Sequence, residues 1–459
     1  MKQPNNQFQT EPQNAVKGDG LLMVTSIFIL LLFLVIALLM VTRKLPTILA
    51  LPILAVGVAA IAGVPLIAVG KDGNDTGLLN FVVQGGATKL GVAYCAVILG
   101  AWLGQFMNQT GISKTIIKGA AELGGDRPFL VTILVTIAVS LLFTTIDGIG
   151  AVIMIATIAM PIMISVGVPA LIGACMFIFA MAIGGIINMS NWAFYTTATG
   201  VQQSQVQAFA VTMAVLTAVV ALIFAIVEFK RSGTKFAWAV QTNPGIPKGE
   251  FVKAPMLSLL TPLIPIVFVI GLKWPILPAF LMGLLWCFVT VWLFSPQKDL
   301  GKLLSLLTKS AFEGMTDSAP AVLLMIGIGM VLNSFMHPQV SQSISPFLKV
   351  IIPGNPVAYV LFFAILAPLA LYRGPLNMWG LGSGVAAVII GLKVLPAPAV
   401  FSAFLATERV QSIGDPTNTH NVWFANYVGT DVNKILLKVL PYIWSLAVVG
   451  LIIAAFMWF

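Results

Sequence analysis

Residues 130–161 read LVTILVTIAVSLLFTTIDGIGAVIMIATIAMP and place one acid and two glycines between two apolar runs. The first run, 130–145, falls only a little short of the about 18 residues that cross a ~30 Å hydrocarbon layer. Asp147, Gly148 and Gly150 then interrupt the apolar pattern. Glycine lets a backbone turn sharply, and unwound backbone at membrane depth survives only where protein or water satisfies its polar groups. The segment therefore predicts a broken membrane helix.

The whole chain has the composition of a polytopic membrane protein. Its 459 residues are 59% hydrophobic and 8% charged, with a mean hydropathy of +1.01. A soluble domain carries about 25% charged residues, so we expect one membrane domain without a soluble catalytic module. Long apolar runs predict an all-α fold with about 10–12 transmembrane helices. Besides the run quoted above, the clearest are 23–40, 45–67, 211–227, 257–272, 276–293, 322–335, 357–371 and 440–459.

Weak internal matches at a nearly constant spacing predict two related halves. Pro46 matches Pro275, an offset of 229 residues (275 − 46), and Trp192 matches Trp423, an offset of 231 (423 − 192). Basic loops alternate in opposite phase in the two halves, which is typical of inverted-topology repeats and predicts that both termini are extracytoplasmic. We expect a disordered polar tail at 1–20, a first transmembrane repeat at 21–229, a basic cytoplasmic linker at 230–254 and a second repeat at 255–459.

The net charge of +9 lies mostly in short loops, which indicates the cytoplasmic side of a membrane rather than nucleic-acid binding. We therefore expect no nucleic-acid partner and a multi-pass location in the bacterial inner (cytoplasmic) membrane. The three cysteines have no metal-like spacing, and the two histidines form no metal or nucleophile–base pattern. No metal site, cofactor or enzymatic activity is expected.

Polar groups inside apolar segments are the candidate binding residues, because they are costly in a membrane and usually face a cavity. Each half contains one broken helix and one turn rich in amides and hydroxyls, and such matched interruptions mark transporter binding sites. The candidate substrate-binding residues are Thr144, Thr145, Gly148, Gly150, Asn188, Ser190, Asn191, Arg373, Asn377, Ser383, Thr417, Asn418 and Thr419. The candidate ion-coupling residues are Asp147, Asp415, His420 and Asn421.

These residue types suit a carboxylate and a cation. Half-helix N-termini at the breaks would offer N–H groups and a positive dipole end to an anion, and the planar fork of Arg373 fits a carboxylate. Amide and hydroxyl oxygens can coordinate a cation, so we expect them to act with Asp147 on the coupling ion, a proton or sodium.

Each candidate also has a structural interpretation. Asp147 and Asp415 can cap broken helices, and Arg373 can pair with an acid. The amides and hydroxyls can hold helices together, at about 0.6 kcal/mol each. We interpret the adjacent Glu408 and Arg409 as an internal ion pair or an interfacial anchor rather than a binding site.

Residues 43–161 resemble the citrate and gluconate permease branches of the ion transporter superfamily. The likeness is strongest in 111–161, where a glycine-rich turn leads to the sequence TIDGIG at 145–150. The elements Ser190-Asn191 and Thr417-Asn418-Thr419 are similar to the paired signature loops of the related dicarboxylate carriers. The resemblance implies two inverted repeats, a scaffold and a moving transport domain, a homodimer, and symport of carboxylates with protons or cations.

The sequence therefore predicts a secondary active transporter that carries citrate, gluconate or a similar carboxylate by proton- or sodium-coupled symport with alternating access. The main alternative is a cation/proton antiporter of the same superfamily, with Asp147 and Asp415 as the exchanging acids. Arg373 disfavours it, because a fixed cation beside the site would repel a cationic substrate. A passive anion channel is a further alternative, which the matched broken helices disfavour.

Overall fold

The computed structural model describes residues 12–42, 44–70, 75–233, 253–294 and 299–459, and most of these residues are helical. Eight helices in this part of the chain are long and apolar enough to cross a membrane. Four further apolar helices are shorter: Thr47–Ile61, Pro128–Phe143, Ile149–Ser165 and Gly382–Leu392. The prediction of an all-α polytopic membrane protein is confirmed. Three of the four shorter helices flank the interruptions that the sequence predicts.

The first half comprises α1 (Pro12–Val41), α2 (Thr47–Ile61), η1 (Leu78–Gly85), α3 (Gly86–Thr88), α4 (Gly91–Gln109), α5 (Ile112–Gly124), α6 (Pro128–Phe143), α7 (Ile149–Ser165), α8 (Ala170–Ile187), α9 (Met189–Thr199) and α10 (Gln203–Ser232). The second half comprises η2 (Met256–Leu260), α11 (Leu263–Ile266), η3 (Val267–Gly271), α12 (Ile276–Phe294), α13 (Leu300–Met336), α14 (Pro338–Ile351), α15 (Pro356–Leu366), η4 (Ala367–Arg373), α16 (Gly382–Leu392), α17 (Ala397–Gly414), α18 (Thr419–Tyr427) and α19 (Val432–Trp458).

The elements of the two halves follow the same order at a nearly constant offset. Helix α2 begins at Thr47 and α12 at Ile276, an offset of 229 residues (276 − 47). Helix α9 begins at Met189 and α18 at Thr419, an offset of 230 (419 − 189). Helices α6 and α7 correspond to α15 and α16 in the same order. Equivalent helices of the two halves are therefore separated by nearly the same number of residues as the weak sequence matches. The inverted orientation of the halves stays a prediction.

The predicted boundaries meet the helices at two places. Helix α1 begins at Pro12, so residues 12–20 are helical, which differs from the disordered tail expected at 1–20. Residues 1–11 lie outside the described residues. Helix α10 continues through Ser232 into the predicted linker, and residues 234–252 of that linker are also outside the described part.

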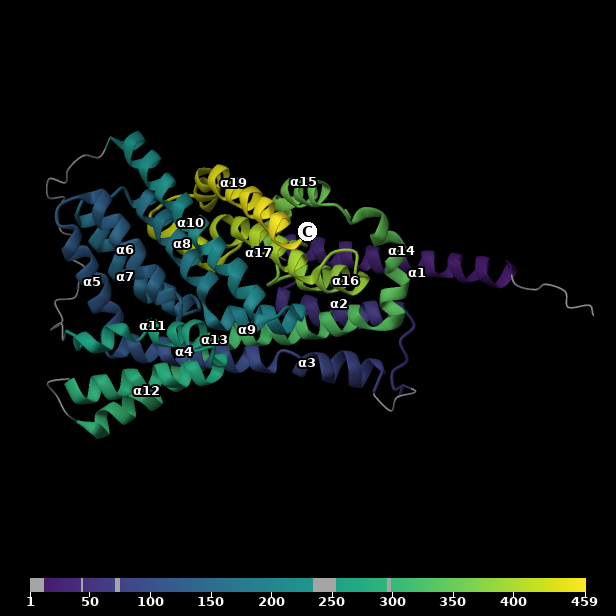
Figure 1. The fold of residues 1–459 in the computed structure, drawn as a ribbon, viewed down its shortest axis with the longest axis horizontal. Helices are drawn as coiled ribbons and strands as arrows, with labels where there is room; N and C mark the ends of the chain where they lie inside the picture. Colours follow the sequence, from purple (N-terminus) through teal and green to yellow (C-terminus); the bar gives the residue numbers. More distant parts are fainter. Residues whose placement is uncertain (1–11, 43, 71–74, 234–252, 295–298) are drawn as a thin grey trace, which may run out of the picture.

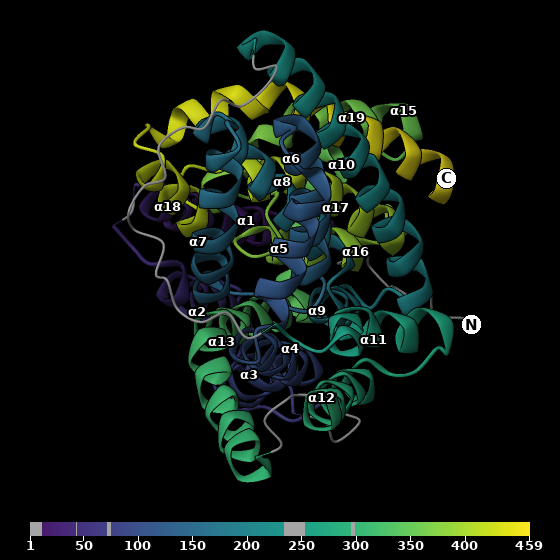
Figure 2. The same ribbon diagram turned by 90° about the vertical axis from the view of Figure 1, so that its left-hand side faces the viewer.

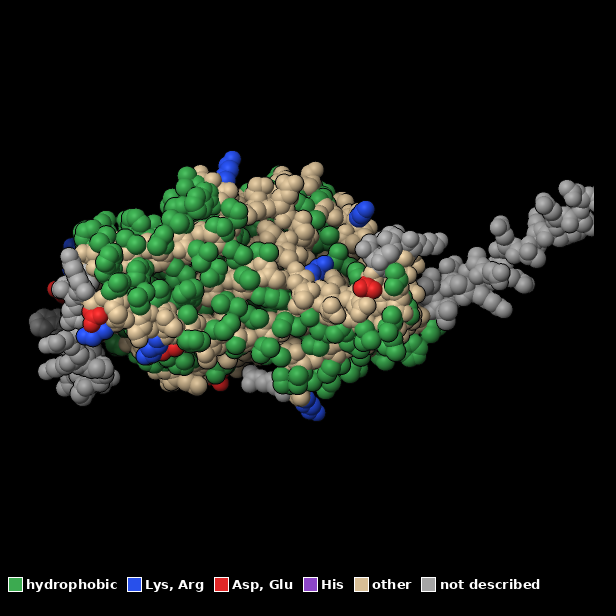
Figure 3. Space-filling view, turned by 90° about the horizontal axis from the view of Figure 1, so that it is seen from below, with side chains coloured by type: hydrophobic (Ala, Val, Ile, Leu, Met, Phe, Trp, Pro, Cys, Tyr) green, Lys and Arg blue, Asp and Glu red, His purple; other side chains and the backbone are tan. Residues whose placement is uncertain are grey.

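The longest helix, α13, packs along α4 and α2 and joins the two halves. In both ribbon views α3, α4, α12 and α13 form a layer along one side of the molecule (Figure 1, Figure 2). Helices α17 and α19 lie toward the opposite side. Apolar side chains cover much of the outer face drawn in Figure 3, and charged ones there are few. Phe28 is 55% exposed and Phe456 is 87% exposed, as expected for side chains that face lipid.

Candidate functional site

The first interruption separates α6 from α7. Helix α6 ends at Phe143, and Gly148 precedes α7 with φ of +94°, a backbone conformation that favours glycine. The side chain of Asn188 crosses to this break, where its Nδ2 donates to the carbonyl oxygens of Phe143 at 3.1 Å and Ile146 at 3.3 Å. Asn188 thereby satisfies backbone acceptors that the broken helix leaves open, as a bilayer requires.

The second interruption lies between η4 and α16. Tyr372 and Arg373 both have φ of +56°, so two consecutive residues turn the chain in the left-handed region. Asn377 then organises the loop, because its Oδ1 accepts from the Trp379 N–H at 2.9 Å. Its backbone carbonyl also accepts from two glycine N–H groups, those of Gly380 and Gly382. The break therefore has a defined shape and carries Arg373 at its start.

The first turns of helices α9 and α18 contain equivalent asparagines. Asn191 Nδ2 donates to the carbonyl of Gly185 at 2.7 Å, and Asn421 Nδ2 donates to the carbonyl of Asp415 at 3.0 Å, in each case six residues earlier. The Oδ1 atoms of both asparagines are buried and have no hydrogen-bond partner within the described part of the chain. An amide oxygen in this state can accept a hydrogen bond from a ligand or coordinate a cation.

A cavity of about 510 Å³ lies where the two breaks, α6–α7 and η4–α16, meet the two turns, α8–α9 and α17–α18. This size suits a small molecule. An adjoining cavity of about 370 Å³ shares Thr47, Arg373 and Thr419 with it. The polar and aromatic residues that line the larger cavity are Thr47, Asp147, Asn191, Asp317, Arg373, Trp379, Glu408, Gln411, Ser412, Asn418, Thr419 and His420. The smaller cavity adds Tyr372 and Thr417.

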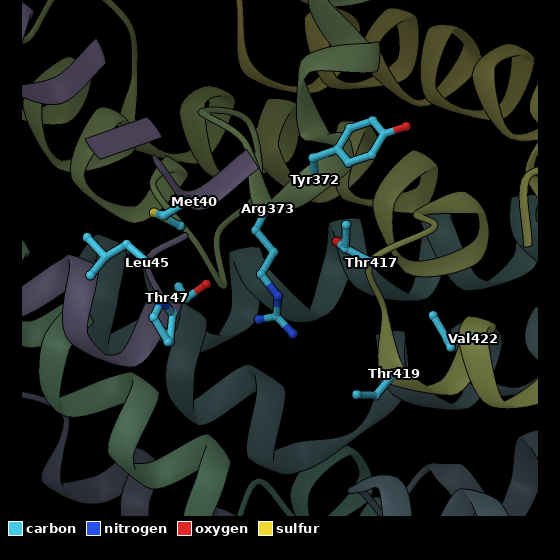
Figure 4. A pocket seen from close by; sticks show the side chains of 9 residues that line it. Met40, Leu45, Thr47, Tyr372, Arg373, Thr417, Thr419 and Val422 are labelled. Carbon is cyan, nitrogen blue, oxygen red and sulfur yellow. The ribbon is translucent and has the colours of Figure 1, made fainter. Parts of the chain in front are cut away.

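Arg373 is the cation of this site. Its side chain extends between Thr47 on one side and Thr417 and Thr419 on the other (Figure 4). The ring of Tyr372 points away from the Arg373 guanidinium. Its guanidinium forms no ion pair within 4.0 Å among the residues that the structure describes. Its backbone N–H donates to Asp415 Oδ2 at 3.3 Å, so the neighbouring break fixes its position.

Two carboxylates flank the start of α7. Asp147 Oδ1 accepts from the Gly148 N–H at 2.7 Å, and Asp317 Oδ2 on α13 accepts from Gln105 Nε2 at 2.6 Å. A methyl group added at Gly150 would lie 2.6 Å from Asp317 Oδ1, so the Asp317 carboxylate can occupy this position only because residue 150 has no side chain. The positive end of the α7 dipole therefore faces two carboxylates and stabilises their negative charge. This differs from the expectation that both half-helix N-termini face a substrate anion.

Glu408 and Arg409 form the predicted internal ion pair, with Oε1 and Nη2 separated by 3.2 Å and both side chains buried. The predicted ion pair is confirmed, whereas its predicted position outside the site is not. The Tyr195 hydroxyl also donates to Glu408 Oε2 at 3.0 Å. Glu408 nevertheless lines the larger cavity, so it belongs to the site as well as to the pair.

About half of the predicted site residues line one of the two cavities, and the others line neither. Those that line a cavity are Asp147, Gly148, Asn191, Arg373, Thr417, Asn418, Thr419 and His420. Those that line neither are Thr144, Thr145, Gly150, Asn188, Ser190, Asn377, Ser383, Asp415 and Asn421. Asp415, for example, is fully buried and accepts from the Thr417 N–H and hydroxyl, both at 2.7 Å.

Sequence reasoning missed Asp317 as a lining residue. The signal was available, because Glu313 and Asp317 stand four residues apart, on one face of a long, mostly apolar helix. Each accepts from a glutamine on α4: Gln109 Nε2 donates to Glu313, as Gln105 does to Asp317. Only Asp317 reaches the cavity. The sequence pattern identifies the acidic face but does not tell these two acids apart.

Comparisons with known proteins place the fold but not the family. No protein-family model matches the chain, and no curated protein matches it. The chain is similar to the crystal structure of the YdaH transporter of Alcanivorax borkumensis, which is described as having an unusual topology. The TM-score is 0.56 at 15% sequence identity, over 93% of this chain and 97% of that one. The chain therefore has the fold of a membrane transporter, and the specific citrate or gluconate branch stays a prediction.

Proposed function

We propose that the protein is a secondary active transporter that carries a small organic carboxylate together with a proton or sodium by alternating access. The observation that supports it most is the position of Arg373 and Asp147. They come from the interruptions of different halves, yet line one cavity, and Arg373 has no ion-pair partner among the described residues. Matched interruptions around a shared cavity are the usual transporter arrangement.

In this proposal the cavity binds its two ligands at opposite ends. The substrate carboxylate lies against the Arg373 guanidinium, with Thr417 and Thr419 beside it. The coupling ion lies near the Asp147 carboxylate, where Asn191 Oδ1, which accepts no hydrogen bond in the described part of the chain, can contribute. A cavity whose charges are balanced can reorient at lower cost than one with a buried uncompensated charge. Each net charge that crosses is worth about 2.3 kcal/mol per 100 mV, which is enough to drive accumulation.

A cation/proton antiporter is the second candidate, because two acidic groups line the cavity besides the paired Glu408. It needs Asp147 and Asp415 to exchange a cation, but Asp415 lies behind the cavity and its oxygens accept bonds from Thr417 and Arg373. An unpaired guanidinium in the cavity also favours an anion. A passive anion channel is disfavoured, because such broken helices serve alternating access.

We further propose that the protein acts as a homodimer in the bacterial inner membrane. The location is supported by the gathering of Lys and Arg in short loops. The dimer rests on the resemblance to carboxylate permeases.

Uptake into proteoliposomes with imposed pH and sodium gradients tests the proposed function. The panel contains citrate, gluconate, dicarboxylates, short monocarboxylates and amino carboxylates. We expect gradient-driven accumulation of at least one of them. Cation-driven proton release without accumulation of any carboxylate would favour the antiporter. Gradient-independent equilibration would favour a channel.

A further inference from the structure

The charges that line the cavity are unequal, and they restrict the substrate. With both carboxyl groups ionised, Asp147 and Asp317 contribute two negative charges, and neither forms an ion pair among the described residues. Arg373 contributes one positive charge. Glu408 and Arg409 cancel each other across 3.2 Å. With His420 neutral, the empty site has one negative charge in excess.

A simple carboxylate increases this excess. A monocarboxylate raises it to two negative charges and a dicarboxylate to three, so two or three cations must enter with them. A molecule with one carboxylate and one ammonium group leaves the excess at one, which a single coupling ion neutralises. Because uncompensated charge inside a membrane protein is costly, the second arrangement is favoured.

The geometry matches this charge pattern. Arg373 stands on the second-half break, whereas Asp147 precedes α7 and Asp317 of α13 lies against the start of α7. Each of these carboxylates keeps one oxygen without a hydrogen bond in the described part of the chain, since only Asp147 Oδ1 and Asp317 Oδ2 accept bonds. Asp317 comes from α13 rather than from a break, so it can receive an ammonium group while Asp147 receives the coupling ion.

We infer that the transported carboxylate is an amino carboxylate, with its carboxylate on Arg373 and its ammonium group on Asp317. This inference rests on the proposed function and narrows its substrate class. It also gives Asp317 a role in substrate specificity, in addition to its hydrogen bond with Gln105.

The test compares matched compounds that differ only in the amino group. The pairs are alanine and propionate, γ-aminobutyrate and butyrate, and glutamate and glutarate, each measured for uptake and for competition in proteoliposomes. We expect the amino member of at least one pair to be preferred by about tenfold or more, as the loss of a charged hydrogen bond predicts. Equal or better uptake of the partner without the amino group overturns the inference and leaves the proposed function standing. No gradient-driven uptake of any compound overturns the proposed function itself.

Two variants distinguish specificity from folding. Asp317→Asn removes the charge but keeps an oxygen toward Gln105, and we expect it to abolish the preference for the amino member. Glu313→Gln changes the neighbouring acid on the same helix face, which also pairs with a glutamine of α4 but does not line the cavity. We expect this control to keep the preference. An unchanged preference in Asp317→Asn, or its loss in both variants, would contradict the assignment of Asp317.

Discussion

At the scale of single residues, we propose that anion binding depends on the guanidinium of Arg373. Arg373→Ala should raise KM for the substrate by about tenfold or more, because a charged hydrogen bond contributes about 1.5–3 kcal/mol. Initial uptake rates in proteoliposomes measure this effect. Lys393→Ala is the matched control, since Lys393 is also cationic and has φ of +54° but lines neither cavity. Equal KM values in the two variants would remove Arg373 from the binding site.

We propose that ion coupling depends on Asp147. Asp147→Asn should abolish accumulation against a gradient, because an amide can neither release a proton nor balance a cation. Exchange of internal for external substrate should persist, since the Arg373 end of the cavity is intact. Counterflow and concentrative uptake in the same vesicles separate the two activities. Undiminished accumulation would exclude Asp147 from coupling.

At the scale of elements, the α7 break is held together by Asn188. Asn188→Ala leaves the carbonyls of Phe143 and Ile146 without this donor, and we expect a loss of about 1–3 kcal/mol for each buried acceptor that stays unsatisfied. Thermal unfolding in detergent measures the loss. Asn426→Ala removes an exposed asparagine from α18, the helix equivalent to α9, and should leave the melting temperature nearly unchanged. Comparable melting of both variants would contradict this role.

The contact between α7 and α13 depends on a missing side chain. Gly150→Ala would place a methyl group 2.6 Å from Asp317 Oδ1, so the Asp317 carboxylate must turn away from the start of α7. Overpacking against fixed atoms costs about 1–3 kcal/mol, but a carboxylate can rotate, so we expect a small fall in the melting temperature together with slower uptake. Gly119→Ala in α5 meets nothing within 4 Å and should be neutral or stabilising. A Gly150→Ala protein as stable and active as the Gly119→Ala protein would show that the contact is not tight.

The breaks could be predicted from the sequence because their causes are local. Asp147 and its glycines, and Pro416 in the α17–α18 turn, disturb helix geometry wherever they stand. Which amide faces the cavity is a different matter. Asn188 and Asn191 are three residues apart, yet one bonds the α7 break and the other lines the cavity. Asp317 was missed for the same reason, since its role comes from the packing of α13 against α7.

At the scale of the whole molecule, the charges of the loops in the two halves predict the orientation of the chain across the membrane. The basic loops predict that both termini are extracytoplasmic and that residues 234–252 are cytoplasmic. In right-side-out vesicles, an impermeant protease should therefore remove tags fused to either terminus. It should spare a cleavage site inserted at 234–252 until the vesicles are opened. Protected terminal tags would show that the chain has the opposite orientation.

The bond from the Arg373 N–H to Asp415 has a consequence for how the substrate range of this protein can change. Asp415 lines neither of the two cavities, yet its carboxylate accepts the bond that holds the Arg373 backbone. We expect a substitution there to move the guanidinium while the residues that line the cavities stay the same. Directed evolution that is restricted to the lining residues would miss this position. Random mutagenesis of the whole chain, with selection for transport of a new carboxylate, should recover substitutions at Asp415.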